Sequence, residues 1–158
     1  MVNYLQDVTG FRGEKILELR LTNFEKFKKP LFRPAFLGDK WPTIDFLVEL
    51  PNVRNRRPYF FGQAKATVTH LGAHLKINVK KADVGKLLRI PGPTYIFGIH
   101  EPSERVFVRA VHSRTPRRGI TRIPIANELT ADNLRVLRDE VKEFWDGIAY
   151  KPKESVFS

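Results

Sequence analysis

Apolar residues recur at helical spacing near both ends of the chain. The first set predicts a helix over residues about 10–24. The second predicts a helix that begins after Thr130, a residue type that often caps helices, and ends at Gly147. The apolar stripe of this last helix consists of Leu134, Leu137, Val141, Phe144 and Trp145. Each helix therefore has one face that can pack on a core.

Between these helices, apolar and polar residues alternate in short runs, as they do in half-buried strands. The predicted strands cover residues 31–37, 43–50, 59–69, 74–79, 94–100 and 105–112. Pro34 marks the first as an edge strand, because proline cannot donate a ladder hydrogen bond. We expect residues 74–79 to extend the same sheet, residues 81–88 to form a short helix, and the last two strands to form a hairpin.

This order of elements predicts an α/β fold with a mixed central β-sheet flanked by helices. The chain has 158 residues, of which 42% are hydrophobic, which is enough for one domain with its own core. It has no cysteine, so disulfides and thiolate metal sites are excluded. Residues 1–7 show no leader pattern, and no apolar run approaches the length of a membrane span. We therefore expect a soluble, cytoplasmic protein with no membrane partner.

The chain is strongly basic. Its 28 Lys and Arg residues against 17 Asp and Glu residues give a net charge of +11. Such a surface attracts polyanions, so we expect a nucleic acid as partner. The alternatives are a solvated surface with no partner, or one that binds an acidic protein or a membrane. The clustered cations are Lys26, Lys28 and Lys29; Arg54, Arg56 and Arg57; and Arg114, Arg117, Arg118 and Arg122, the last four in an expected loop. We expect the two arginine clusters to contact the nucleic acid.

A carboxylate, an amide and an amine come together in the predicted sheet. Asp45 lies in the strand 43–50, and Gln63 and Lys65 lie in the strand 59–69. Because side chains alternate along a strand, Gln63 and Lys65 point to one face and Ala64 to the other. If the two strands pair, Asp45 lies beside them. Such a patch suits a hard divalent cation with an activated water; the alternative is a surface hairpin with ordinary polar positions.

These residues, in this order of elements, resemble the PD-(D/E)XK nuclease superfamily. Its αβββαβ core presents an acidic residue from the first helix, an Asp from the second strand and (E/Q)xK from the third. The matching residues are Glu14, Asp45, Gln63 and Lys65, and the Gln63 form is similar to the QxK variant of Mrr-type restriction endonucleases. Over residues about 10–146 the chain is most similar to the bacterial domain-of-unknown-function family 4365. It departs from the superfamily pattern in two ways: Pro42 is not adjacent to Asp45, and Gln63 replaces a carboxylate.

The resemblance implies a restriction-endonuclease-like core with an added strand and a C-terminal helix. It implies one nuclease-like domain over residues 1–158, in which 147–158 form a tail. In such an enzyme Asp45, Gln63 and Glu14 would bind Mg²⁺ or Mn²⁺, and Lys65 would orient the attacking water or stabilise developing charge.

The function that the resemblance implies is an endonuclease that hydrolyses phosphodiester bonds in DNA, in restriction or phage defence. We expect a homodimer, and a partner protein that supplies specificity. Two alternatives stay open: a non-catalytic nucleic-acid-binding module of the same fold, and a basic interaction domain for an acidic protein partner.

Overall fold

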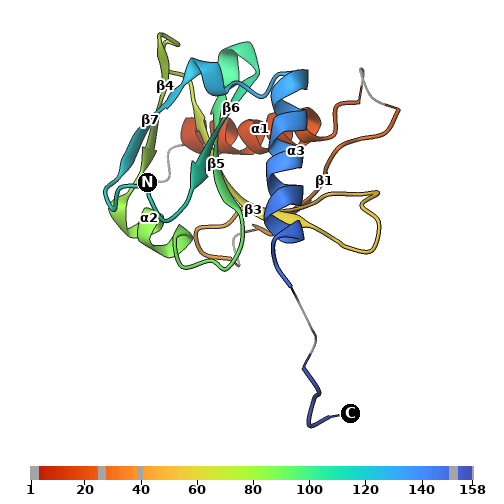
Figure 1. Ribbon diagram of the computed structural model, residues 1–158. Helices are drawn as coiled ribbons and strands as arrows, with labels where there is room; N and C mark the ends of the chain where they lie inside the picture. Colours follow the sequence, from red (N-terminus) through yellow and green to blue (C-terminus); the bar gives the residue numbers. More distant parts are fainter. Residues whose placement is uncertain (1–3, 25–27, 39–40, 150–152, 158) are drawn as a thin grey trace.

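The computed structural model describes residues 4–24, 28–38, 41–149 and 153–157. In chain order its elements are α1 (Tyr4–Leu21), β1 (Arg33–Phe36), β2 (Phe46–Glu49), β3 (Tyr59–Thr67), β4 (His74–Val79), α2 (Lys81–Leu87), β5 (Thr94–His100), η2 (Glu101–Ser103), β6 (Arg105–Val111), β7 (Ile120–Pro124), η3 (Ile125–Asn127) and α3 (Ala131–Asp146). Helices α1 and α3 lie on one side of the main sheet, and β4, β7 and α2 lie on the other (Figure 1).

The main sheet has the order β1-β2-β3-β5-β6. Strands β3 and β5 run parallel, and the other neighbours are antiparallel. The mixed sheet and the α/β class are therefore confirmed. So are the edge position of β1, which contains Pro34, and the hairpin formed by β5 and β6.

Two expectations about strands are wrong. Strand β4 does not extend the main sheet but pairs with β7 in a separate two-stranded sheet. Residues 120–124, expected in a loop, form β7, so Arg122 lies on a strand. Only Ile120 and Ile123 of this strand are buried, a spacing that breaks strict alternation. Pairing with β4 is what makes the segment extended, and that partner is distant in sequence.

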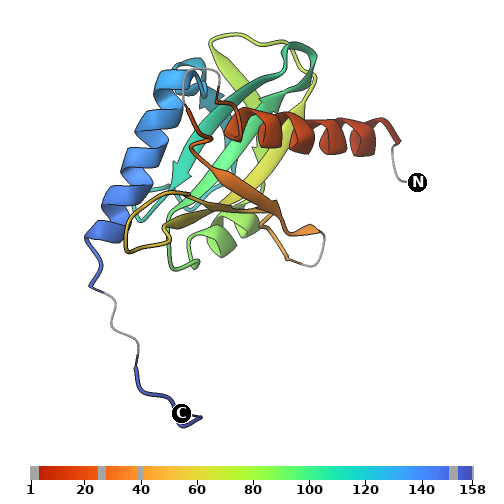
Figure 2. The ribbon, with the colours of Figure 1, turned by 90° about the vertical axis from the view of Figure 1, so that its right-hand side faces the viewer.

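The terminal helices differ in how well their sequence pattern predicts them. Helix α1 begins at Tyr4, well before the predicted start, and its buried residues are Gly13, Leu17 and Leu21. Its first turns carry the exposed side chains of Tyr4 and Leu5, so no apolar stripe marks them. Figure 2 shows this end of α1 projecting beyond the sheet.

Helix α3 confirms its prediction closely. The side chain of Thr130 accepts a hydrogen bond from the backbone N–H of Asn133, and the cap at the other end is Gly147. Leu134, Leu137 and Val141 are buried, whereas Phe144 is exposed. The helix packs on the same face of the sheet as α1.

Two apolar layers result, one on each face of the main sheet. The first contains Leu17 of α1, Phe60 and Phe97 of the sheet, and Leu137 of α3. The second joins Ile96 of β5 to the inner residues of β4, β7 and α2. Within the residues described above, no helix is long and apolar enough to cross a membrane.

Candidate functional site

Asp45 lies directly before β2, at the point where this strand begins to pair with β3. Its backbone N–H donates to the carbonyl of Gly62 at 2.9 Å, and its carbonyl accepts from the N–H of Leu37 at 2.8 Å. Its carboxylate oxygen Oδ2 accepts from the N–H of Ala64 at 2.7 Å. The carboxylate is therefore held against the middle of the Gln63-Ala64-Lys65 segment.

Gln63 and Lys65 lie on β3 on either side of this contact. Ala64 and Ala66 pack against the apolar layer that contains α1, whereas Phe61 packs against the opposite layer. Alternation assigns Gln63 and Lys65 to the face of Phe61, as the sequence predicts. The separation of their Cα atoms is about 6.6 Å, two strand residues.

Gln63 is buried in an unusual way for an amide side chain. It is only 4% exposed, and its Oε1 atom has no hydrogen-bond partner among the described residues. Its neighbour on β5 is Ile96, an apolar residue. Leaving a buried acceptor unpaired costs on the order of 1–3 kcal/mol. A cation is one ligand that would satisfy such an oxygen.

Glu14 lies on α1, which packs on the face of β3 that presents Ala64 and Ala66. A Cβ at its neighbour Gly13 would lie 2.5 Å from the Cβ of Ala66, so the helix backbone lies directly on β3. Gly10 and Lys65 both line a hollow of about 690 Å³ between α1 and the end of β3. Glu14, half-buried, comes one helical turn after Gly10 on the same side of α1. The structure thus holds Asp45 against the β3 segment that contains Gln63 and Lys65, whereas α1, which carries Glu14, packs on the face of β3 that presents Ala64 and Ala66.

The donor atoms fit a hard cation with few protein ligands. A carboxylate has about four lone-pair sites, so Asp45 can accept the Ala64 amide and still bind a metal. The Gln63 amide oxygen is also a suitable ligand for Mg²⁺ or Mn²⁺. Across residues 4–24, 28–38, 41–149 and 153–157, no three His, Cys, Asp or Glu side chains group closely enough to hold a metal. A cation bound here would keep several water ligands, as Mg²⁺ commonly does.

The predicted nucleic-acid contacts divide between two parts of the molecule. Arg54, Arg56 and Arg57 lie between β2 and β3, at the opposite end of β3 from Lys65. Arg56 donates to the backbone carbonyls of Trp145 and Ile148, so it caps the end of α3. Arg114, Arg117 and Arg118 lie between β6 and β7, and Arg122 lies on β7.

The third predicted basic cluster is described only in part, since Lys26 lies outside the described residues.

Two features of this region escape sequence reasoning. One is the backbone amide of Ala64, which can donate a hydrogen bond to Asp45 only when β2 and β3 pair. The other is Lys76 on β4, which lies directly opposite Arg122 on β7. Its signal is the polar half of the alternation in residues 74–79, but its partner lies in a segment that the sequence indicates as a loop.

Compared with known proteins, the chain matches no protein-family model and no curated protein, so the resemblance to the PD-(D/E)XK superfamily stays a prediction.

Proposed function

We propose that this protein is a metal-dependent nuclease-like domain that hydrolyses phosphodiester bonds in DNA. One observation carries the proposal: the Asp45 carboxylate accepts a hydrogen bond from the Ala64 amide, whose chain neighbours are Lys65 and Gln63, and the buried oxygen of Gln63 has no hydrogen-bond partner among the described residues. The paired segments thus carry an anionic oxygen ligand (Asp45), a neutral oxygen ligand (Gln63) and a positive charge (Lys65). The net charge of +11 supports a polyanionic substrate.

Each side chain has a role that follows from its chemistry. Asp45 and Gln63 would hold Mg²⁺ or Mn²⁺, with Glu14 contributing from α1. The bound cation would supply Lewis-acid assistance to the attacking water and the scissile phosphate. Lys65, a compact positive charge at the hollow beside α1, would stabilise the negative charge that develops on the phosphate oxygens. A homodimer would supply two such sites for the two strands of a duplex.

The small number of acidic side chains near the candidate site favours one alternative function, a module that binds DNA without cutting it. Because no cluster of three metal-ligating side chains exists in the described part of the chain, a non-catalytic DNA-binding module of the same architecture is the second candidate. Both candidates predict DNA binding, but only the first predicts cleavage.

The test is cleavage of supercoiled plasmid, linear duplex, single-stranded and branched DNA with Mg²⁺ or Mn²⁺. We expect cutting that EDTA abolishes and that Lys65→Met and Asp45→Asn reduce by at least about 100-fold, the scale of a lost transition-state stabiliser. Arg33→Gln is the matched control, since Arg33 is exposed on edge strand β1. If Lys65→Met or Asp45→Asn cut DNA at the wild-type rate, the assignment of that residue to the catalytic site would be wrong. Binding without cutting in any metal would favour the non-catalytic module.

A further inference from the structure

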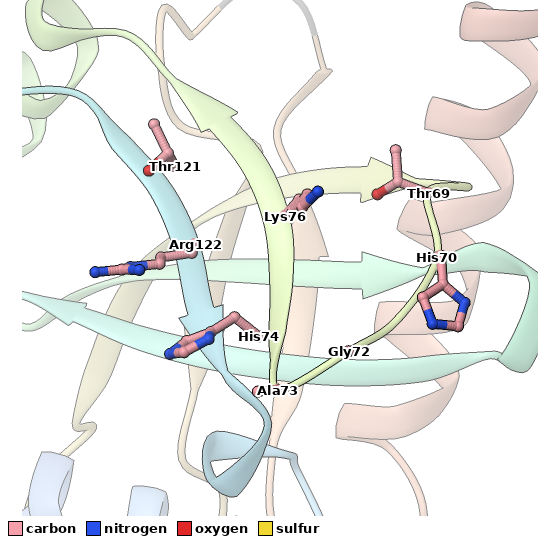
Figure 3. Close-up of a pocket in the computed structure, with 8 residues that line it drawn as sticks. All are labelled: Thr69, His70, Gly72, Ala73, His74, Lys76, Thr121 and Arg122. Atoms are coloured by element: carbon pink, nitrogen blue, oxygen red, sulfur yellow. The ribbon is translucent and has the colours of Figure 1, made fainter.

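Strands β4 and β7 form a two-stranded ribbon with one buried face and one exposed face. The inner face consists of Leu75, Ile77, Val79, Ile120 and Ile123, all buried. It packs so closely on the main sheet that a Cβ at Gly98 would lie 2.6 Å from Cδ2 of Leu75. Figure 3 looks onto the outer face, with the ribbon crossing in front of the main sheet. The outer face is therefore held firmly and turned to solvent.

Two positive charges face each other across this ribbon. Lys76 and Arg122 are register partners, and both are exposed. Like charges directly opposite on one face of an antiparallel pair are destabilising. Among the described residues neither side chain pairs with a carboxylate. Residues 50–82 and 105–127, which contain both strands, include no Asp or Glu. An anion bound between Lys76 and Arg122 would offset the repulsion between their positive charges.

The surface around this pair offers further donors. A cavity of about 500 Å³ is lined by Lys76 and Arg122 together with Thr69, His70, His74 and Thr121 (Figure 3). The side chains of His74 and Arg122 extend in the same direction. Imidazole and hydroxyl groups donate hydrogen bonds to phosphate oxygens, as guanidinium and ammonium groups do.

The composition of the cavity distinguishes among nucleic acids. No Phe, Tyr or Trp is among its lining residues, so it lacks the usual platform on which the bases of a single strand stack. A strand of the length of β4 spans about 20 Å, and duplex DNA carries one charge per roughly 1.7 Å of its axis. The exposed residues Arg114, Arg117 and Arg118 continue the positive surface into the segment before β7. A basic surface without stacking residues fits the backbone of a duplex.

We propose that the outer face of the β4–β7 ribbon binds the phosphate backbone of duplex DNA, with Lys76 and Arg122 as its central contacts. The inference rests on the proposed function for the identity of the polyanion, and deepens it by naming the surface that holds the substrate. Thr69 of the cavity follows shortly after the end of β3, the strand that carries Gln63 and Lys65. DNA on the ribbon would therefore pass close to the candidate site.

The test is the salt dependence of binding to a fluorescently labelled duplex, measured by anisotropy in EDTA so that cleavage plays no part. Lys76→Gln with Arg122→Gln should lower the slope of log affinity against log salt by about 1.8, or 0.9 for each lost phosphate contact. Lys29→Gln with Arg33→Gln removes the same charge at and just before edge strand β1, outside both expected arginine contacts, and should leave the slope close to the wild-type value. Both changed residues of the ribbon variant are exposed, and losing their repulsion should raise its melting temperature.

Four results would overturn the inference: an unchanged slope in the ribbon variant, loss of slope only in the Lys29 and Arg33 variant, tighter wild-type binding to single-stranded than to duplex DNA, and poly-glutamate competing as well as DNA. Failure of the proposed function looks different. Duplex binding that depends on Lys76 and Arg122, without cleavage in any metal, would leave the ribbon inference standing and remove the nuclease.

Discussion

The carboxylate of Asp45 accepts a hydrogen bond from the backbone N–H of Ala64 at 2.7 Å, and this contact joins β2 to β3 where the candidate site lies. The same atoms thus serve structure and proposed chemistry. Any substitution of Asp45 changes both the stability of the fold and the proposed cleavage. The choice of replacement has to separate these two effects.

Asp45→Ala should destabilise the fold by about 1–3 kcal/mol, because it leaves the Ala64 amide without its acceptor. Asp45→Asn keeps a carbonyl oxygen in reach and should lose clearly less. Urea unfolding of the two variants checks this difference. Equal losses would mean that the amide contact contributes little to stability, and Asp45→Ala would then serve as well as Asn in the cleavage assay.

Gly13→Ala should destabilise the fold by about 1–3 kcal/mol, because the added Cβ would overlap that of Ala66. Gly10→Ala is the matched control, since a Cβ there meets nothing within 4 Å. That change should stabilise the protein by about 0.5–1 kcal/mol through helix propensity. Thermal unfolding measures both. The double variant Gly13→Ala with Ala66→Gly should recover part of the loss, and an additive loss would argue against a direct clash.

Gln63→Met should raise the stability of the metal-free protein, by an amount on the order of 1 kcal/mol, because it removes a buried acceptor without a partner. The same change should abolish any rise in melting temperature on adding Mg²⁺ or Mn²⁺. Melting curves with and without metal give both results. A variant that is less stable than wild type would indicate that the amide oxygen is already satisfied by water, and a retained metal shift would exclude Gln63 as a ligand.

Glu128→Gln should lower the free energy of unfolding at neutral pH but not in strong acid. The hydrogen bonds from Arg105, at 3.0 and 2.6 Å, hold the pKa of Glu128 below its ordinary value. A depressed carboxyl pKa stabilises the fold above the unfolded-state value of about 4.3, and this contribution is lost as pH falls through the folded-state value.

Urea unfolding of wild type and Glu128→Gln between neutral pH and about pH 2 checks this expectation. The gap between them should be about 1 kcal/mol at neutral pH, because the pair is partly exposed, and it should close in acid. Lys142, whose ion pair with Asp146 is more exposed, gives the control: Lys142→Gln should change stability less. A gap that does not vary with pH would assign the effect to packing.

The sequence predicts those parts of this fold whose signals are local. Helix α3 has its cap at Thr130 and an apolar stripe, β3 begins with three aromatic residues, and every residue of β5 is buried. The pairing of Asp45 with the Gln63 and Lys65 segment follows from a short connection between neighbouring strands. These features need no knowledge of distant residues.

The parts that the sequence does not predict depend on contacts between distant segments. Strand β7 is extended because it pairs with β4, and the opposition of Lys76 to Arg122 exists only in that register. The start of α1 carries exposed apolar side chains, so its sequence lacks the apolar stripe from which a helix is predicted. The role of Arg56 as a cap on α3 likewise joins two segments far apart in the chain.

The mixed pairing of β3 also sets an order of events for the folding chain. Strand β2 reaches β3 through a short connection, whereas β5 can join it only after the chain has passed through β4 and α2. Closing the longer connection costs more entropy, so the β2–β3 hairpin has the earlier opportunity to form. The hydrogen bond of Asp45 belongs to that hairpin, but the apolar neighbour of Gln63 is Ile96 on β5. We therefore expect the Asp45 contact to form before the Gln63 oxygen is buried against β5.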